Sequence, residues 1–186
     1  MKWVAIDFET ANAKFASACS VGVVVYDNTK EIERWSMLIK PKKEFRYFDW
    51  RNIRIHHIHP EDVKEASGFN EVYFRLKPYF DEAIFVAHNA DFDMNVLKQC
   101  CLCWNLKVPK LNYFCTVRLA KQCFPSLKHH RLNDCCEYMK VELNHHDALS
   151  DAVGCAMIVK TCMENQQVDE LEGFIIKNQI PVQVLN

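Results

Sequence analysis

The sequence has almost no net charge, no apolar run of membrane-spanning length, and no repeat or low-complexity segment. Its formal charge of −1 over 186 residues excludes the strong basic field of proteins that bind duplex nucleic acid through phosphate contacts alone. An acid at position 7 interrupts the first apolar run too early for a signal peptide. These absences predict a soluble, cytoplasmic protein without a membrane segment, in which any contact with nucleic acid is local.

Cysteine, in contrast, is abundant, with ten residues that lie mostly within apolar segments. Such positions favour small buried thiols in a reducing compartment over a disulfide framework. The spacing Cys100-Cys101-Leu102-Cys103 raises the alternative of a zinc site, but it falls within a helical pattern and lacks a second ligand pair with its own turn residues. We therefore give zinc little weight.

The order of the predicted elements indicates one α/β domain. At 49% hydrophobic residues the chain can build one full core, and strand patterns come first, followed by alternating helix and strand patterns. This order predicts a mixed sheet covered by helices. Residues 41–60 are basic and aromatic without periodicity, which predicts an extended surface connection, and residues after 165 have no distinctive pattern. The predicted strands are 3–8, 18–26, 32–39, 84–87 and 111–115, and the predicted helices are 69–80, 91–103, 117–124, 132–139 and 147–163.

The first strand carries two acids where a buried strand should be apolar. In Ala5-Ile6-Asp7-Phe8-Glu9-Thr10, residues two apart point to the same side, so Asp7 and Glu9 share one face. Two like charges this close cost stability unless a cation lies between them. The alternative is a pair of exposed acids at a strand end.

Two further segments supply acids next to strands or helices. His88-Asn89-Ala90-Asp91-Phe92-Asp93 follows a short apolar strand and begins a helix, which places Asp93 at the edge of the sheet where ligands of open sheets bind. His146 and Asp151 lie at the start of the last long helix, and the five-residue spacing requires His146 to precede the first turn, on a loop. Hard divalent cations prefer such oxygen ligands, and two ions can clamp both oxygens of a phosphoryl transfer.

These three segments closely resemble the three motifs of the DEDDh, or DnaQ-like, 3′-to-5′ exonucleases. The resemblance runs from about Trp3 to Met163. Three adjoining words resemble a bacterial stand-alone branch of this superfamily, which includes the epsilon subunit of DNA polymerase III and ribonuclease T: Ser17-Ala18-Cys19-Ser20-Val21-Gly22, His130-Arg131-Leu132-Asn133 and His145-His146-Asp147-Ala148-Leu149. It implies a ribonuclease H-like mixed sheet of five strands with helices on both faces. We accordingly assign residues 1–165 to the exonuclease domain and leave 166–186 as a C-terminal tail, which could pack on its own sheet, pair with a second copy or dock a polymerase.

The resemblance also implies roles for individual residues. Asp7, Glu9, Asp93 and Asp151 would hold two Mg²⁺ or Mn²⁺ ions, and His146 would be the general base that takes a proton from the attacking water. The implied substrate contacts are Phe8, Thr10, Phe15, His56, Ile58, His88 and Asn89.

Some of these contacts have structural alternatives. Phe15 could stack on a frayed base or simply pack on the sheet, and His88 and Asn89 could order the loop instead of touching substrate. The lysines and arginines of 41–60 could grip phosphates or form a solvated loop. One departure stands out: His57 occupies a position that is often glycine in relatives, and we expect it to obstruct a positive φ or a close backbone approach.

The sequence thus predicts a metal-dependent exonuclease that releases nucleoside 5′-monophosphates from the 3′ ends of single-stranded DNA. The alternatives are an RNA exonuclease and a non-catalytic domain of the same fold that binds nucleic acid or a polymerase. The sequence gives no indication of the oligomeric state.

Overall fold

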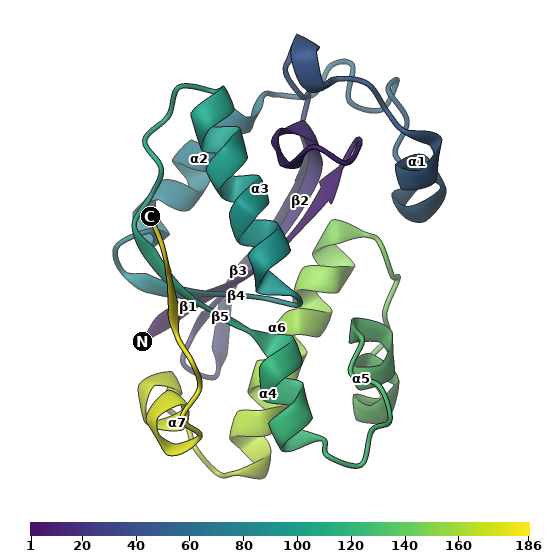
Figure 1. Cartoon of the computed structure of the whole chain (residues 1–186). Helices are drawn as coiled ribbons and strands as arrows, with labels where there is room; N and C mark the ends of the chain where they lie inside the picture. The colour runs from purple at the N-terminus through teal and green to yellow at the C-terminus, as the bar shows by residue number, and fades with distance from the viewer.

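The computed structural model describes all residues 1–186 and is built around a six-stranded mixed sheet in the order β3-β2-β1-β4-β5-β6 (Figure 1). β1 runs antiparallel to β2 and parallel to β4, and β4 runs parallel to β5. The predicted ribonuclease H-like mixed sheet is confirmed, with one strand more than the resemblance implies. The strands are β1 (Lys2–Thr10), β2 (Ala18–Asp27), β3 (Lys30–Leu38), β4 (Ala83–Ala87), β5 (Leu111–Cys115) and β6 (Gln183–Leu185).

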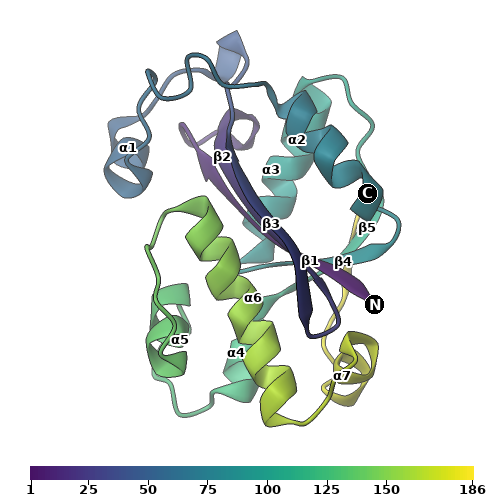
Figure 2. The same cartoon turned by 180° about the vertical axis from the view of Figure 1, so that it is seen from behind.

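Helices cover both faces of the sheet, as Figures 1 and 2 show. One face is packed by α2 and α3, and the other by α4, α5, α6 and α7. None of the helices combines the length and apolarity that a membrane span requires. The helices are α1 (Trp50–His56), α2 (Phe69–Leu76), α3 (Ala90–Cys103), α4 (Thr116–Cys123), α5 (Leu132–Met139), α6 (Ala148–Asn165) and α7 (Leu171–Lys177), with 3₁₀ turns at Phe15–Ser17, Lys43–Phe45 and Lys77–Tyr79.

Successive side chains of β1 point alternately into the two cores on either face of the sheet. Val4, Ile6 and Phe8 belong to the core under α2 and α3, whereas Trp3 and Ala5 belong to the core under α6. The next two positions on the α6 side are Asp7 and Glu9, so the predicted period of two is confirmed and both acids face the start of α6.

Two segments differ from the prediction. The stretch 41–60 is not a plain extended connection, because it contains α1. The Asp49 side chain caps this helix by accepting a hydrogen bond from Arg51 N at 2.9 Å. The tail also has regular structure, since α7 and β6 add Phe174 and Leu185 to the two cores. These elements have only three to seven residues each, so a helical or strand period repeats too few times in them to be detected from the sequence.

His57 does adopt the positive φ that we expected it to obstruct. It forms the C-cap of α1 at φ 59° and ψ 14°, and its N–H donates to the Ile53 carbonyl. A β-carbon in this left-handed region costs roughly 1–2 kcal/mol, which glycine avoids. The backbone path typical of a glycine is therefore kept here despite the side chain.

We expect His57→Gly to raise the free energy of unfolding by about 0.5–1 kcal/mol, because removal of the strain outweighs the greater freedom of glycine in the unfolded chain. Urea unfolding of both proteins measures this difference. His59→Gly is the matched control: His59 has no positive φ, so the same change there should lower stability slightly. A loss of stability in His57→Gly as large as in the control would contradict the strain.

Candidate active site

Acids from β1 and α6 meet at the end of the sheet. Ligand oxygens of Asp7, Glu9 and Asp151 all lie within 4.8 Å of one another. Asp7 and Glu9 come from the end of β1, and Asp151 comes from the first turn of α6, which packs across β1 and β2. The two strongest sequence motifs are therefore neighbours in space although more than 140 residues separate them.

Gly22 makes this approach possible. It lies on β2 opposite Asp7, and a β-carbon placed there would be 2.0 Å from the Ala148 carbonyl oxygen and 2.4 Å from Leu149 N. Both atoms are backbone of the first turn of α6, which cannot rotate away as a side chain can. The absent side chain of Gly22 is what lets α6 begin directly on the sheet.

Asp93 joins the acids from the opposite layer. It lies in the first turn of α3, is 1% exposed, and its Oδ1 accepts a hydrogen bond from Phe8 N at 3.0 Å. Because β4 pairs with β1 only from Lys2 to Ala5, Phe8 N lies beyond β4, and the Asp93 carboxylate satisfies it. This bond fixes Asp93 beside Asp7.

The four carboxylates lie close together without a balancing cation from the chain. Burial, with repulsion from Asp93 and Glu9, raises the pKa of Asp7 well above its usual value. Burial and the charge of Asp151 raise the pKa of Glu9 to about 8. Burial likewise raises the pKa of Asp93, against the effect of its bond from Phe8 N. No lysine or arginine forms an ion pair with any of the four acids.

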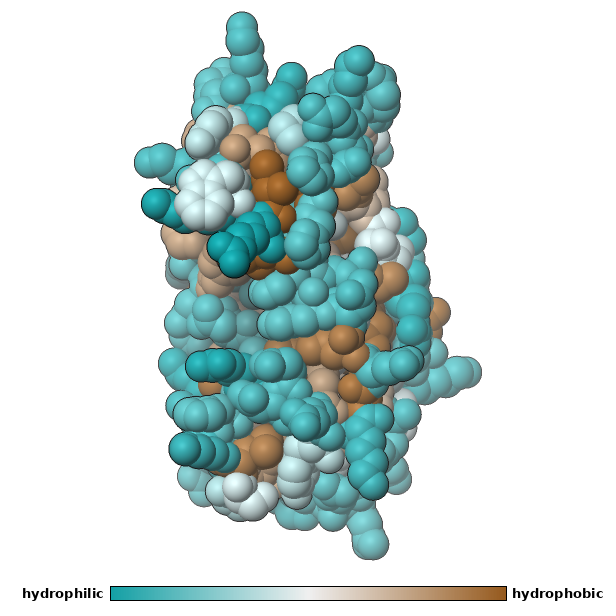
Figure 3. Space-filling model, turned by 90° about the vertical axis from the view of Figure 1, so that its right-hand side faces the viewer, coloured by the Kyte–Doolittle hydropathy of each residue, from teal (hydrophilic) through white to brown (hydrophobic).

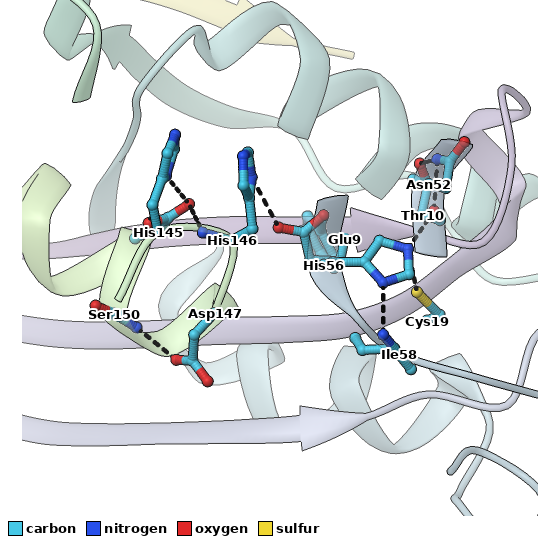
Figure 4. Close-up of polar contacts among 12 residues, drawn as sticks. Glu9, Thr10, Cys19, Asn52, His56, Ile58, His145, His146, Asp147 and Ser150 are labelled. Atoms are coloured by element: carbon cyan, nitrogen blue, oxygen red, sulfur yellow. Dashed lines mark hydrogen bonds and ion pairs between the residues drawn. The ribbon is translucent and has the colours of Figure 1, made fainter. Parts of the chain in front are cut away.

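His146 lies on the loop before α6, as the spacing predicts. Its backbone has φ 68°, its N–H donates to Asp151 Oδ2 at 3.1 Å, and its Nδ1 is 4.0 Å from Glu9 Oε1 (Figure 4). Burial and the neighbouring His145 lower the pKa of His146, so the ring is neutral near pH 7. Neither ring nitrogen has a hydrogen-bond partner in the chain, which leaves both open to water or substrate.

His145 is a residue of the site that the sequence interpretation missed. Its ring stacks on that of His146 with 3.8 Å between centroids, and its Nδ1 contacts both carboxylate oxygens of Asp151 at 3.1 and 3.2 Å. The contact from His145 orients the Asp151 carboxylate, and the ring stacking orients the His146 side chain. The signal was present in the word His145-His146-Asp147, but a sequence spacing alone does not say which of two adjacent histidines faces an acid.

Asp7, Glu9 and Asp151 line a cavity of about 770 Å³, whereas Asp93 is buried behind it. This volume is suited to a nucleotide-sized ligand. Five of the seven predicted substrate contacts line it, whereas two do not: the ring of Phe15 packs edge-on against Phe92, which does line it, and Ile58 lines a smaller adjoining cavity. The five lining residues are Phe8, Thr10, His56, His88 and Asn89.

Two of the lining histidines, His56 and His88, use both ring nitrogens for hydrogen bonds within the protein. His56 donates from Nε2 to Thr10 O at 3.2 Å and accepts at Nδ1 from Ile58 N at 3.0 Å, and burial lowers its pKa. His88 contacts Thr116 Oγ1 and the His130 carbonyl, each at 3.0 Å, and burial lowers its pKa to about 4. These bonds favour the structural alternative for His88, namely that it orders the loop around the cavity.

The wall opposite α1 carries cations that the sequence interpretation did not assign to the site. Lys121 comes from the end of α4, and Lys128 and Arg131 come from the segment between α4 and α5. The cavity thus has acids at one part of its lining and cations at another. This arrangement is complementary to a nucleic-acid ligand, because the acids could hold a metal that binds one phosphate and the cations could contact another. The word His130-Arg131-Leu132-Asn133 was the only sequence signal for this wall.

The donor set fits divalent cations such as Mg²⁺. Three mutually repelling carboxylates within 4.8 Å, together with a fourth at Asp93, form an oxygen-rich site that a hard cation would stabilise. The alternative group of His145, His146 and Asp151 is less suitable, because two stacked, nearly parallel rings do not direct their in-plane lone pairs to one point.

We expect the chain without metal to lose stability as the pH rises. A raised pKa in the folded state means that the folded chain holds protons which the unfolded chain has released, so stability falls between about pH 4.5 and 8, the window set by Glu9. The loss should be of the order of a few kcal/mol. Thermal unfolding in EDTA at pH 5 and pH 8 measures it, and added Mg²⁺ should restore more stability at pH 8.

Glu9→Gln provides the control for this experiment, because it removes one titrating acid and should make the dependence on pH shallower. A midpoint in EDTA that is flat or rises from pH 5 to pH 8 would contradict the electrostatic account of the site.

Comparisons with known proteins agree with this geometry. A family model described as exonuclease, of the RNase T type, matches residues 4–159. The chain is 30% identical over 171 residues to DNA polymerase III PolC-type of Ureaplasma parvum serovar 3, covering 88% of this chain and 12% of that protein. It is 26% identical over 165 residues to 3′-5′ exonuclease DinG of Staphylococcus aureus, covering 87% of this chain and 18% of that protein. The chain therefore spans less than a fifth of either relative.

Solved structures show the same fold. The nuclease domain of 3′hExo, described as a DEDDh family member bound to rAMP, superposes with a TM-score of 0.75 at 15% identity, covering 91% of this chain and 94% of that chain. At this identity the similarity shows the fold alone. Since the exonuclease model covers more than half of the chain and spans all three motifs gathered at the cavity, this protein belongs to the DEDDh (DnaQ-like) exonuclease family.

Proposed function

We propose that this chain is a 3′-to-5′ exonuclease that uses two divalent ions, Mg²⁺ or Mn²⁺, to release nucleoside 5′-monophosphates from the ends of single-stranded nucleic acid, with DNA preferred over RNA. The observation that carries the proposal is the meeting of Asp7, Glu9 and Asp151 within 4.8 Å, beside Asp93 and with His146 at 4.0 Å from Glu9. These are the five residues that the family resemblance assigns to catalysis.

The acids would hold the ions and the histidine would move the proton. Bound divalent cations supply Lewis-acid polarisation of the phosphate and neutralise its developing charge. Asp7, Glu9 and Asp151, with Asp93 beside them, would hold the ions. Burial lowers the pKa of His146, and its ring nitrogens have no hydrogen-bond partner in the chain, so the ring could accept a proton from the attacking water.

The charge distribution supports binding of a strand by its end. The protein has a net charge of −1, so it lacks the field needed to track a long stretch of phosphates. The cavity wall itself carries three positive side chains, Lys121, Lys128 and Arg131. A terminal nucleotide placed on the acids would therefore bring the phosphate nearest to it toward these three cations.

The preference for DNA draws on the similarity to a DNA polymerase III of the PolC type. That protein is several times longer than this chain, and we propose a polymerase partner and a proofreading role on the same similarity. The bound rAMP of 3′hExo keeps an RNA substrate as the rival within the same chemistry. A non-catalytic binding role is the second rival, and the complete set of acids with His146 stands against it.

One cleavage experiment separates these possibilities. The chain is incubated with matched single-stranded DNA, duplex DNA and single-stranded RNA of the same sequence, each labelled at the 5′ end, with Mg²⁺, Mn²⁺ or EDTA. We expect a ladder of strands shortened from the 3′ end, release of 5′-monophosphates, fastest trimming of single-stranded DNA, and no trimming in EDTA. Faster trimming of RNA would reverse the substrate preference, and binding without any trimming in either metal would favour the non-catalytic alternative.

A further inference from the structure

We propose that the exposed side of α1 and its preceding turn form a second contact surface for single-stranded nucleic acid, which takes the nucleotides before the terminal one. This α1 surface consists of Arg46, Tyr47, Trp50, Arg51 and Arg54. The inference rests on the proposed function in one respect, namely that the 3′ end of the strand occupies the acidic cavity.

Two large aromatic side chains on this surface are exposed to solvent. Tyr47 is 68% exposed and Trp50 is 61% exposed, whereas Trp3 and Trp35 are buried. Arg46, Arg51 and Arg54 beside them are also exposed. Figure 3 views the side of the molecule that bears α1 above and α5 below, and pale and brown surface gathers among teal in its upper part. Exposed aromatic surface of this kind usually marks an interaction site.

The segment is held firmly, so the exposure of its side chains is not a result of a loose loop. Phe48, between the two exposed aromatic residues, is buried in a small core with Ala11 and Val63. Asp49 N donates to Ala11 O at 2.8 Å, and the Asn52 side chain donates to Thr10 O at 2.8 Å. Both bonds attach α1 to the chain directly after Glu9, which fixes the surface relative to the acids.

The α1 surface is continuous with the cavity. Asn52 and Ile55 of α1 line the cavity that holds the acids. Arg51 precedes Ile55 by one helical turn, so the two side chains share one side of α1. The Arg51 guanidinium lies 5.5 Å from the centre of the Trp50 ring. A strand that leaves the cavity over Ile55 therefore meets first a cation and then an aromatic face.

The positive charge of the α1 surface favours a negatively charged ligand. Three arginines face solvent, and the single acid among them, Asp49, is engaged as the cap of α1 through Arg51 N. A surface with alternating arginines and aromatic rings is complementary to a strand that offers phosphates and unpaired bases. Stacking on aromatic rings tolerates any base, which suits an enzyme that shortens strands of every sequence.

Binding and kinetics with oligothymidylates of two and eight nucleotides test the inference. In the active chain with Mg²⁺, Trp50→Ala should raise KM for the octamer about tenfold, the size of one base–aromatic stacking contact, and leave kcat and the KM for the dimer unchanged. In the Asp7→Asn background, octamer binding should quench tryptophan fluorescence, and Trp50→Phe should remove the quenching while keeping the affinity within about twofold, since phenylalanine still stacks.

Phe74→Ala is the matched control, because Phe74 is 56% exposed on α2, on the other side of α3 from α1 (Figures 1 and 2). It should leave octamer affinity unchanged. Equal octamer binding by the parent chain and Trp50→Ala would overturn the inference and leave the surface to a protein partner. A third outcome is that the parent chain cleaves none of the substrates, while Trp50→Ala still weakens octamer binding. In that case the exonuclease proposal fails and the proposal of the α1 surface is retained.

Discussion

Replacement of Asp7 by asparagine is expected to lower the rate of strand cleavage by about a thousandfold or more. The other carboxylates surround Asp7, so its loss should weaken the binding of any cation at the site. Weaker cation binding should remove several kcal/mol of transition-state stabilisation. Asparagine keeps the size of the side chain, so packing is not the cause of the effect. Single-turnover cleavage of a labelled strand at saturating Mg²⁺ measures the rate.

The same change should stabilise the chain when metal is absent. A buried carboxylate that is repelled by its neighbours costs free energy in the folded state, and the neutral amide does not. Thermal unfolding in EDTA at pH 8 should therefore give a higher midpoint for Asp7→Asn than for the parent chain. Opposite effects on activity and stability separate a functional acid from a structural one.

Asp147→Asn is the control for this pair of measurements. Asp147 is the exposed cap of α6, it accepts a hydrogen bond from Ser150 N at 2.9 Å, and its charge also raises the pKa of Asp7. Asparagine caps helices as well as aspartate does, so this variant removes one nearby charge and keeps the structure. We expect its cleavage rate to stay within a few-fold of the parent. Parent-like cleavage by Asp7→Asn would remove the basis of the catalytic assignment.

Substitution of Gly22, which does not line the cavity, should still lower activity because it displaces α6. In Gly22→Ala the new β-carbon would overlap the Ala148 carbonyl oxygen, which lies 2.0 Å away, so α6 must shift off β2. The shift carries Asp151 and the loop with His146 away from Asp7. Overpacking of this kind costs about 1–3 kcal/mol of stability, and a displacement near 1 Å at a catalytic group can cost about a hundredfold in rate.

Gly173→Ala is the matched control for Gly22→Ala. Nothing lies within 4 Å of a β-carbon at Gly173, which is exposed in α7, so alanine there should raise stability by about 0.5–1 kcal/mol and leave cleavage unchanged. Urea unfolding and the cleavage assay are applied to both variants, and a Gly22→Val protein extends the series to a larger clash. Full activity together with unchanged stability in Gly22→Ala would show that α6 does not depend on this contact for its position.

Much of the fold follows from local patterns in the chain. The period of two in β1 placed Asp7 and Glu9 on one face, and helical spacing identified α3 and α6 to within a residue or two at each end. The weak elements were missed for a physical reason. α1 has seven residues and owes its position to Phe48 and to bonds from Asn52, which are contacts with distant parts of the chain.

The candidate site shows the same division between local and distant effects. Residue types and their order identified the acids and His146 as a metal-site hypothesis. They did not reveal that His145 contacts Asp151, or that His56 and His88 use their ring nitrogens within the protein. A hydrogen bond depends on a direction and a distance in space, and these are fixed only when the elements have packed.

By itself, then, the sequence determined which side chains could bind metal and on which face of each element they lie, because backbone geometry fixes the period of a strand or helix. Only the tertiary structure decided that these faces meet, because that depends on the close approach of α6 to β2 at Gly22 and on the bond from Phe8 N to Asp93. Packing between distant segments has no counterpart in local periodicity, so the cationic wall and the α1 surface became visible only in the folded chain.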